Sequence, residues 1–303
     1  MVGLGGAAFP THVKFSPTEK PIHTLIINGC ECEPYLTADH RVMVEMPDCV
    51  IEGVAIALHA ARAKRAIIAV EDNKSDAILA LEKARLHRKG ENIEIRVLPA
   101  HYPQGAEKLL ISVLLGMELP SGKLPADLGV LVSNVSTLAE IALLIPGGRG
   151  LIERVITISG PGVKGAGNYL VPIGTPLDFL LEQVGVTADA AEVICGGPMM
   201  GLSVARLSVP LTKAVSGLLV MGPKSAEPAR PCIRCGACLE ACPLHLNPSR
   251  LGLLAQKDRF SEMADSYHLF DCFECGSGSY VCPSGIPLVQ YFRMAKKQLR
   301  KNR

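Results

Sequence analysis

The sequence contains no tryptophan, and aromatic residues make up only 4% of its 303 residues. It also lacks an excess of either charge, because 31 Lys and Arg residues stand against 29 Asp and Glu residues. General nucleic-acid binders usually carry a larger basic excess, and proteins that bind single strands stack the bases on aromatic rings. These two shortages argue against nucleic acid as a partner.

Long apolar runs are missing as well. The stretch from Leu109 to Met117 is among the longest, at nine residues, whereas a membrane-spanning helix needs about 18. The first ten residues, MVGLGGAAFP, lack the charged start and the apolar stretch of a secretory signal peptide. The sequence therefore predicts neither a spanning helix nor a signal peptide.

Cysteine is abundant, with 11 residues. An odd number of cysteines in a long chain without an export signal is poorly explained by disulfides, so metal or redox chemistry is the better hypothesis. Four are scattered over the first two thirds of the chain and are expected to be packing residues, whereas the other seven fall between Cys232 and Cys282. This shift, together with the breaker-rich segment MGPKSAEPARP at 221–231, predicts a domain boundary near residue 225.

The first cysteine motif fits C-x2-C-x2-C-x3-C-P at every position, with Cys232, Cys235, Cys238 and Cys242 followed by Pro243. This spacing lets one loop supply three ligands to a [4Fe–4S] cluster, while the fourth cysteine reaches the other cluster of a two-cluster ferredoxin. A zinc ribbon would instead show two separated pairs of ligands. The motif thus predicts an iron–sulfur site.

A second copy begins 40 residues later and contains Cys272, Cys275, Cys282 and Pro283, but Gly278 replaces the third cysteine. In two-cluster ferredoxins, the fourth cysteine of each motif binds the cluster of the other motif. By this rule the first cluster takes Cys282 and the second takes Cys242, which leaves the second cluster one ligand short. The open iron would bind water or a hydroxyl of Ser277 or Ser279, or it would be lost to give a three-iron cluster. A chain without a second cluster is the remaining alternative. The segment between the motifs, 248–264, is amphipathic and predicted to be helical.

The first 150 residues have the alternation of an α/β domain. Short apolar runs suit buried parallel strands, and the segments between them repeat apolar residues at helical spacing. Strands are predicted at 24–27, 66–70, 93–98 and 129–132, and helices at 43–63, 75–88 and 105–115. From residue 154 to about 221 a strand at 155–159, a short helix at 176–184 and a β-rich remainder predict a small α+β module.

Two polar segments of the α/β region are candidates for ligand binding. The opening G-x-G-G segment would let backbone amides approach a phosphate or a flavin ring, although it is not a dinucleotide fingerprint. The loop Asn28–Tyr35 follows the first predicted strand, at the carboxyl end where open α/β sheets bind ligands. In an extended segment, Glu31 and Glu33 would point to similar sides and grip hydroxyls or an amide.

Several segments together resemble a known family. The segments GLGGAAFPTHVKF, INGCECEPYLTADHRVM, HYPQGAEKLLI and NYLVPIGTP, with the paired cysteine motifs, are similar to the C subunit of the Rnf-type (Rsx) ion-translocating electron-transport complex. That protein is related to the FMN- and NADH-binding subunit of respiratory complex I. The resemblance covers essentially the whole chain.

The resemblance implies a multidomain α/β protein with three parts. These are an FMN/NADH-binding α/β domain at 1–150, a β-grasp module of the SLBB type at 151–223, and a helical two-cluster ferredoxin domain at 224–303. An N-terminal domain that is usual in the family is not in the chain, which suggests a truncated product or a misassigned start.

The resemblance also assigns roles to individual residues. Glu31 and Glu33 become candidate catalytic residues, beside the flavin and the nicotinamide respectively. The implied cofactor-binding residues are Gly3, Gly5, Gly6 and Lys14 around FMN and its phosphate, Asn28 beside the flavin, Tyr102, Gly105 and Glu107 on the opposite side, and Asn134 and Thr137 at the phosphate end. The implied metal ligands are Cys232, Cys235, Cys238, Cys242, Cys272, Cys275 and Cys282. Apart from Gly278, the chain departs from the family pattern at Ala8, where a glycine is usual.

The function implied by the resemblance is electron transfer from NADH through FMN to [4Fe–4S] clusters, coupled in the complex to ion translocation and to electron exchange between ferredoxin and NAD. The implied partners are the membrane subunits of the complex and a ferredoxin or iron–sulfur subunit. The implied location is peripheral, on the cytoplasmic face of the bacterial inner membrane. Two alternatives stay open: an iron–sulfur relay or assembly module without flavin activity, and a cobalamin reductase of bacterial microcompartments. The basic segment 293–303 is either a solvated helix end or a contact for anionic lipid or an acidic partner.

Overall fold

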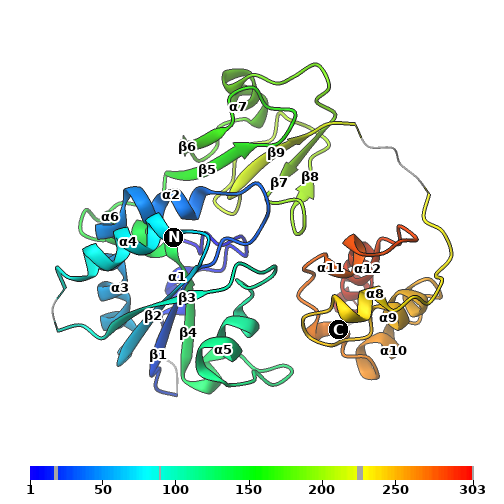
Figure 1. The fold of residues 1–303 in the computed structure, drawn as a ribbon, viewed down its shortest axis with the longest axis horizontal. Helices are drawn as coiled ribbons and strands as arrows, with labels where there is room; N and C mark the ends of the chain where they lie inside the picture. The colour runs from blue at the N-terminus through cyan, green and yellow to red at the C-terminus, as the bar shows by residue number, and fades with distance from the viewer. Residues whose placement is uncertain (17–19, 89, 224–227, 302–303) are drawn as a thin grey trace. The chain divides into compact units, whose positions relative to one another are not determined.

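The computed structural model describes residues 1–16, 20–88, 90–223 and 228–301, and the chain divides into two compact units, Met1–Pro223 and Lys224–Arg303 (Figure 1). Part of the predicted boundary segment at 221–231, and the last two residues of the basic segment, lie outside the described residues. Across the described ranges, every helix is too short or too polar to cross a bilayer.

The first unit begins with a four-stranded parallel sheet made of β1 (Thr24–Gly29), β2 (Arg65–Glu71), β3 (Ile93–Leu98) and β4 (Val130–Asn134). The strands lie in the order β3-β2-β1-β4. The chain therefore steps outward from β1 to β3 and then returns to the other side of β1. The gap between the carboxyl ends of β1 and β4 is the topological switch point, where sheets of this kind bind ligands.

Helices cover both faces of this sheet (Figure 1). One face packs in a single apolar core against α2 (Ala38–Glu45), α3 (Pro47–Ala61), α4 (Ser75–Arg85) and α6 (Val135–Leu144). The other face packs against α5 (Glu107–Leu115). In β1 the side chains alternate accordingly, with Leu25 and Ile27 in the larger core and Ile26 in the smaller one. Burial on both faces explains why β1 and β2 read as continuous apolar runs, whereas the edge strand β3 carries Glu94 and Arg96.

Two predicted helices are each two helices in the structure. The segment 43–63 is divided between α2 and α3, because Pro47 occupies the first turn of α3, where its missing N–H costs no hydrogen bond. The segment 248–264 is divided into α9 (Pro248–Ala255) and α10 (Phe260–Asp265), and Asp258 between them has a φ of +53°. Apolar spacing continues across both breaks, which is why the pattern alone predicted single helices.

The rest of the first unit is a five-stranded mixed sheet with one helix, α7 (Leu177–Val184). Its strands are β5 (Glu153–Ser159), β6 (Gly167–Pro172), β7 (Glu192–Cys195), β8 (Leu202–Ser203) and β9 (Gly217–Met221), in the order β6-β5-β9-β7-β8. The central pair β5 and β9 is parallel, and the other pairs are antiparallel. A separate apolar core packs α7 against this sheet.

The unit Lys224–Arg303 is built from short helices and loops. Besides α9 and α10 it contains α8 (Ala237–Glu240), α11 (Ser277–Tyr280) and α12 (Leu288–Lys301). Its core is formed mainly by Leu251, Met263, Leu269 and Phe292, and half-buried cysteines pack against it. A small core bordered by cysteines is typical of a domain that folds around inorganic clusters.

Candidate functional site

A cavity of about 220 Å³ lies at the switch point of the parallel sheet, and we call it the switch-point cavity. It is bordered by the N-terminal glycine-rich loop, by the carboxyl ends of β1 and β4, and by the first turns of α5 and α6. Among the predicted cofactor-binding residues, those that line it are Gly3, Gly5, Lys14, Asn28, Gly105, Glu107, Asn134 and Thr137.

The glycine-rich loop is held against β4 and α6 by specific contacts. The Leu4 amide donates a hydrogen bond to Thr137 Oγ1 at 2.8 Å. A Cβ atom added at Gly5 would lie 3.1 Å from Asn134 Cβ, which is tighter than ordinary packing. Asn134 Oδ1 in turn accepts a hydrogen bond from the Thr137 amide and caps α6. The start of α6 therefore faces the cavity, as expected for the site of an anionic group.

Gly6 and Ala8 shape the turn of this loop. Gly6 has a φ of +97° but does not line the cavity, so its part is conformational. Ala8 lines the cavity and has a φ of +51°, in the left-handed region that favours glycine. The alanine at this position thus adds backbone strain to the loop.

Asn28 and Gly105 join the end of β1 to the loop before α5. Asn28 Nδ2 donates to the Gly105 carbonyl at 2.8 Å, and Asn28 Oδ1 accepts from the Cys30 amide at 3.0 Å. A Cβ atom at Gly105 would lie 2.6 Å from the Cys30 carbonyl oxygen, a distance that real side chains do not adopt. Only glycine therefore permits this close approach of the two loops.

Lys14 and Glu107 face each other across the cavity. Their side chains form an ion pair at 3.8 Å, and Lys14 Nζ also donates to the Val132 carbonyl at 2.6 Å. Burial raises the pKa of Glu107, and the charge of Lys14 acts in the opposite direction. The pair gives this part of the cavity one cation and one carboxylate.

A second cavity, of about 390 Å³, lies at the carboxyl ends of β1, β2 and β3. Three predicted site residues line it, namely Glu31, Glu33 and Tyr102. The loop that begins at Asn28 borders both cavities, with Asn28 lining the switch-point cavity and Glu31 lining the second one.

The Glu31 carboxylate caps the beginning of α2. It accepts hydrogen bonds from the Asp39 and His40 amides, both at 3.0 Å. Burial raises the pKa of Glu31 to about 8, with a further contribution from the Asp39 charge. Asp39 is half-buried and accepts hydrogen bonds from Asn134 Nδ2 and Ser136 Oγ. This network connects the second cavity to the end of β4.

The Glu33 carboxylate has different partners from Glu31. It accepts hydrogen bonds from the Met199 amide at 3.1 Å and the Met200 amide at 2.7 Å, in the loop after β7. The expectation of an extended segment at Glu31 and Glu33 is therefore wrong, because the chain bends at Glu33, although both residues line the same cavity. Burial raises the pKa of Glu33, while the two amides lower it.

A buried cation at the second cavity was not predicted from the sequence. Lys74 forms a buried ion pair with Glu71, and its Nζ also lies 3.5 Å from the Glu31 carbonyl oxygen. Both Lys74 and Glu71 line the second cavity. The signal that could have found them is EDNK, a charged segment directly after the apolar run of β2.

Arg154 is a second residue that was not predicted. It lies on β5 with only 1% of its surface exposed. Its guanidinium donates to the Leu4 carbonyl at 3.3 Å and to the Lys213 carbonyl. Arg154 therefore connects the glycine-rich loop to the mixed sheet. An arginine inside an apolar strand was the available signal.

The two cysteine motifs have the same backbone conformation, displaced by 40 residues. Arg234 and Glu274 have φ values of +57° and +64°, and Gly236 and Gly276 both have +85°. A four-residue helix follows in each motif, α8 in the first and α11 in the second. Gly278 lies in α11 where Cys238 lies in α8, so the second loop keeps its shape without its third cysteine.

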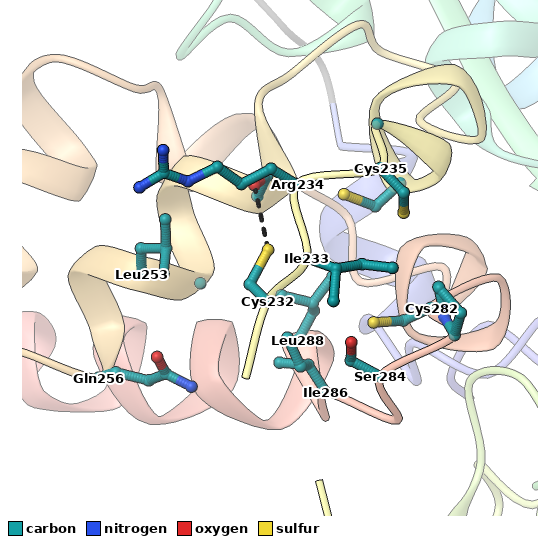
Figure 2. Close-up of a pocket in the computed structure, with 15 residues that line it drawn as sticks. Cys232, Ile233, Arg234, Cys235, Leu253, Gln256, Cys282, Ser284, Ile286 and Leu288 are labelled. Atoms are coloured by element: carbon teal, nitrogen blue, oxygen red, sulfur yellow. Dashed lines mark hydrogen bonds between the residues drawn. The ribbon is translucent and has the colours of Figure 1, made fainter. Parts of the chain in front are cut away.

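Four cysteines from both motifs line one cavity: Cys232, Cys235, Cys238 and Cys282. Figure 2 shows Cys232, Cys235 and Cys282 around it, with Ile233, Ile286 and Leu288 as apolar neighbours. Burial raises the pKa of the Cys238 thiol, and the charges of the other three cysteines raise it further. Four thiols in an apolar surround are the donor set of a [4Fe–4S] cluster, so these residues fit the group.

The second set of cysteines is incomplete. Cys272 and Cys275 are close enough for the charge of Cys275 to raise the pKa of Cys272, after the larger effect of burial. Within the described ranges, His, Cys, Asp and Glu side chains form no group of three that could hold a single metal ion. A cluster is a different case, because each thiolate binds its own iron atom. Under the predicted exchange of fourth ligands the second site has three cysteines, Cys242, Cys272 and Cys275, one fewer than a fully ligated [4Fe–4S] cluster needs.

Comparison with family models identifies three domains in this order. Residues 1–143 match the Nuo51 FMN-binding domain, residues 155–203 match the SLBB domain, and residues 228–286 match the 4Fe-4S dicluster domain. These matches confirm the predicted fold class and the FMN and 4Fe–4S cofactor classes. The individual site residues and the domain boundaries stay predictions.

The chain is also similar to named proteins, each of them the C subunit of a complex. It is 46% identical to that of the proton-translocating ferredoxin:NAD(+) oxidoreductase complex of Clostridium ljungdahlii, over 99% of this chain and 66% of that protein. It is 42% identical to the C subunit of the Na(+)-translocating ferredoxin:NAD(+) oxidoreductase complex of Acetobacterium woodii, over 99% of this chain and 68% of that protein. It is 45% identical to the C subunit of the ion-translocating oxidoreductase complex of Pasteurella multocida, over 99% of this chain and 36% of that protein. The chain thus spans between about a third and two thirds of these relatives.

Among solved structures, the fold is similar to a chain of an NAD+-reducing [NiFe]-hydrogenase in the H2-reduced state. The TM-score is 0.71 at 21% identity, over 98% of this chain and 60% of that chain. This likeness concerns the fold alone. The identity to the Acetobacterium woodii protein, 42% over 99% of this chain and 68% of that protein, confirms the expected family: the chain belongs to the family of C subunits of ion-translocating ferredoxin:NAD(+) oxidoreductase complexes.

Proposed function

We propose that the chain passes electrons from NADH through FMN to iron–sulfur clusters, as the electron-input subunit of an ion-translocating complex that exchanges electrons between ferredoxin and NAD. The observation that carries the proposal is the pair of cavities at the carboxyl edge of the parallel sheet. They share the loop from Asn28 to Glu33, and the same chain carries the paired cysteine motifs.

The switch-point cavity is the proposed FMN site. Its glycines allow backbone approach, and Lys14 and the start of α6 supply positive charge for a phosphate. Asn28, Gly105 and Glu107 also line this cavity, and the loop that begins at Asn28 continues to the second cavity. In this arrangement the chain binds and orients the flavin, and Gly5 and Thr137 hold the loop that covers it.

The second cavity is the proposed nicotinamide site. Glu33 and Tyr102 line it, and the buried Lys74 contributes a cation at its wall. We assign Glu31 a positioning role, because its carboxylate already accepts two backbone hydrogen bonds at the start of α2. When bound, FMN would accept hydride from NADH and release electrons singly.

The cysteines Cys232, Cys235, Cys238 and Cys282 are the proposed ligands of the first cluster. The proposed partners are the membrane subunits of the complex and a ferredoxin or iron–sulfur subunit, on the cytoplasmic face of the bacterial inner membrane. The basic face of α12 supports an acidic partner. Lys297, Arg300 and Lys301 are exposed there, next to the Glu274 loop of the second motif.

The test is flavin binding and reduction by the purified chain. After anaerobic reconstitution, we expect about one FMN per chain and bleaching of the flavin absorbance by NADH. A chain with iron and sulfide that never takes up flavin would instead be a relay or assembly module. A loaded chain that reduces cobalamin faster than iron–sulfur acceptors would be the microcompartment reductase.

A further inference from the structure

The second cysteine motif presents a question that the proposed function leaves open. Its loop has the conformation of the first loop, but its third ligand is missing. The fate of the corresponding iron depends on which atoms surround the position that a cysteine side chain would occupy.

Those surroundings are apolar. A Cβ atom built at Gly278 would lie 3.5 Å from Leu288 Cδ1, 3.6 Å from Pro248 Cβ and 3.7 Å from Cys238 Cβ. All three are ordinary packing distances, and none of these atoms is an oxygen or nitrogen donor. The atoms nearest to this position therefore include no substitute ligand.

The two neighbouring serines already have other partners. Ser279 Oγ accepts a hydrogen bond from the Val289 amide at 3.0 Å, which fixes it at the start of α12. Ser277 Oγ lies 3.4 Å from Cys275 Sγ, and Ser277 is buried. The equivalent residue in the first motif is Ala237, which has no donor atom in its side chain. Ser277 thus contacts a ligand sulfur from a position that is not a ligand position in the repeat.

We infer that Cys242, Cys272 and Cys275 hold a [3Fe–4S] cluster, and that its open corner binds one additional ferrous ion reversibly. The charges and electrons of this step balance, because a reduced [3Fe–4S]⁰ core and one Fe²⁺ combine to [4Fe–4S]²⁺ without electron transfer. The inference rests on the iron–sulfur assignment within the proposed function, but it does not require that the chain bind flavin or oxidise NADH.

The test uses the full chain, purified and reconstituted without oxygen, with iron and sulfide quantified and EPR recorded before and after reduction. We expect about seven irons per chain, four from the first site and three from the second. We also expect an EPR signal of an oxidised three-iron cluster before any reductant is added. Reduction followed by Fe²⁺ should bring the count to about eight and remove that signal.

Two variants make the result specific to Gly278. Gly278→Cys restores the missing thiol in a position where its Cβ fits without a clash, and it should hold about eight irons and give no three-iron signal. Ser277→Ala should leave both the iron count and the EPR signal of the unmodified chain unchanged.

Three results would overturn the inference: about eight irons in the unmodified chain without a three-iron signal, about four irons because the second site is empty, or a Ser277→Ala chain that loses iron. A chain with seven irons but no flavin would leave the inference intact and contradict the proposed function instead.

Discussion

Ala8 lies at the rim of the switch-point cavity with a φ of +51°, a conformation that costs an alanine about 1 kcal/mol or more. This strain is present in the folded chain whether or not a cofactor is bound, so Ala8→Gly should raise the free energy of unfolding, by up to about 1 kcal/mol. Urea unfolding of the apoprotein measures it. Ala7→Gly, a change in the same loop at a residue without a positive φ, is the control and should not raise the free energy of unfolding.

Glu31 gives the molecule a pH dependence with a definite sign. Burial raises its pKa to about 8, so between about pH 5 and pH 8 the folded chain keeps a proton that the unfolded chain has released. The free energy of unfolding therefore falls as the pH rises through this window. Glu31→Gln removes this contribution, so the stability of the variant relative to the unmodified chain should rise with pH.

Urea unfolding at several pH values checks this prediction. The expected difference between the two slopes is up to roughly 1 kcal/mol per pH unit. Glu182→Gln, at an exposed position on α7, is the control and should give a curve parallel to that of the unmodified chain. A Glu31→Gln curve that is also parallel would contradict the assignment of the raised pKa to Glu31.

At the scale of elements, the mixed sheet holds the glycine-rich loop through Arg154 on β5. Arg154→Met leaves the Leu4 and Lys213 carbonyls without their donor, and each lost buried partner costs about 1–3 kcal/mol. We expect a lower unfolding free energy and, in the folded fraction, FMN binding weakened about tenfold. Arg154→Lys keeps the charge but cannot reach both carbonyls with a planar fork, so its FMN affinity should lie between those of the unmodified chain and Arg154→Met.

The measurement compares FMN titration with urea unfolding for each variant. If Arg154 only stabilised the fold, Arg154→Met would lower the free energy of unfolding without changing the affinity of the folded chain for FMN. That outcome would contradict the positioning of the loop by Arg154.

Elements whose signal lies within one short segment were predictable from the sequence. The strands near residues 24 and 66 lie inside the sheet, and each was a recognisable apolar run. The strand near residue 93 lies at the edge of the sheet and alternates apolar and charged residues, a pattern that is also local. The ligand spacing of the first cysteine motif is set within one loop, and it was readable for the same reason. The helix break at Pro47 was readable from the proline itself, which is unfavourable inside a helix. The break at Asp258 was not predictable, because the apolar spacing continues through it.

The contacts that complete the proposed flavin and nicotinamide sites could not be predicted, because they join distant parts of the chain. The Arg154–Leu4 and Glu33–Met200 hydrogen bonds connect residues 150 and 167 positions apart. The apolar repeat within a short segment carries no information about a contact between residues so far apart. The sequence therefore predicted which residues border the cavities better than it predicted what holds them in place.

For the whole molecule, hydride chemistry and single-electron chemistry are proposed to lie on one chain. The α/β domain provides the two adjoining cavities, and the unit Lys224–Arg303 provides the cysteines. Each unit has its own apolar core. The central claim is therefore that electrons from NADH reach the iron–sulfur clusters of the same chain through FMN.

The most direct test is EPR of the FMN-loaded chain, frozen after NADH is added in the absence of oxygen. We predict bleaching of the flavin together with the EPR signal of a reduced cluster. In a flavin-free sample of the same chain, NADH should produce no reduced-cluster signal. A flavin that stays oxidised with NADH, or clusters that NADH reduces equally well without flavin, would contradict the claim.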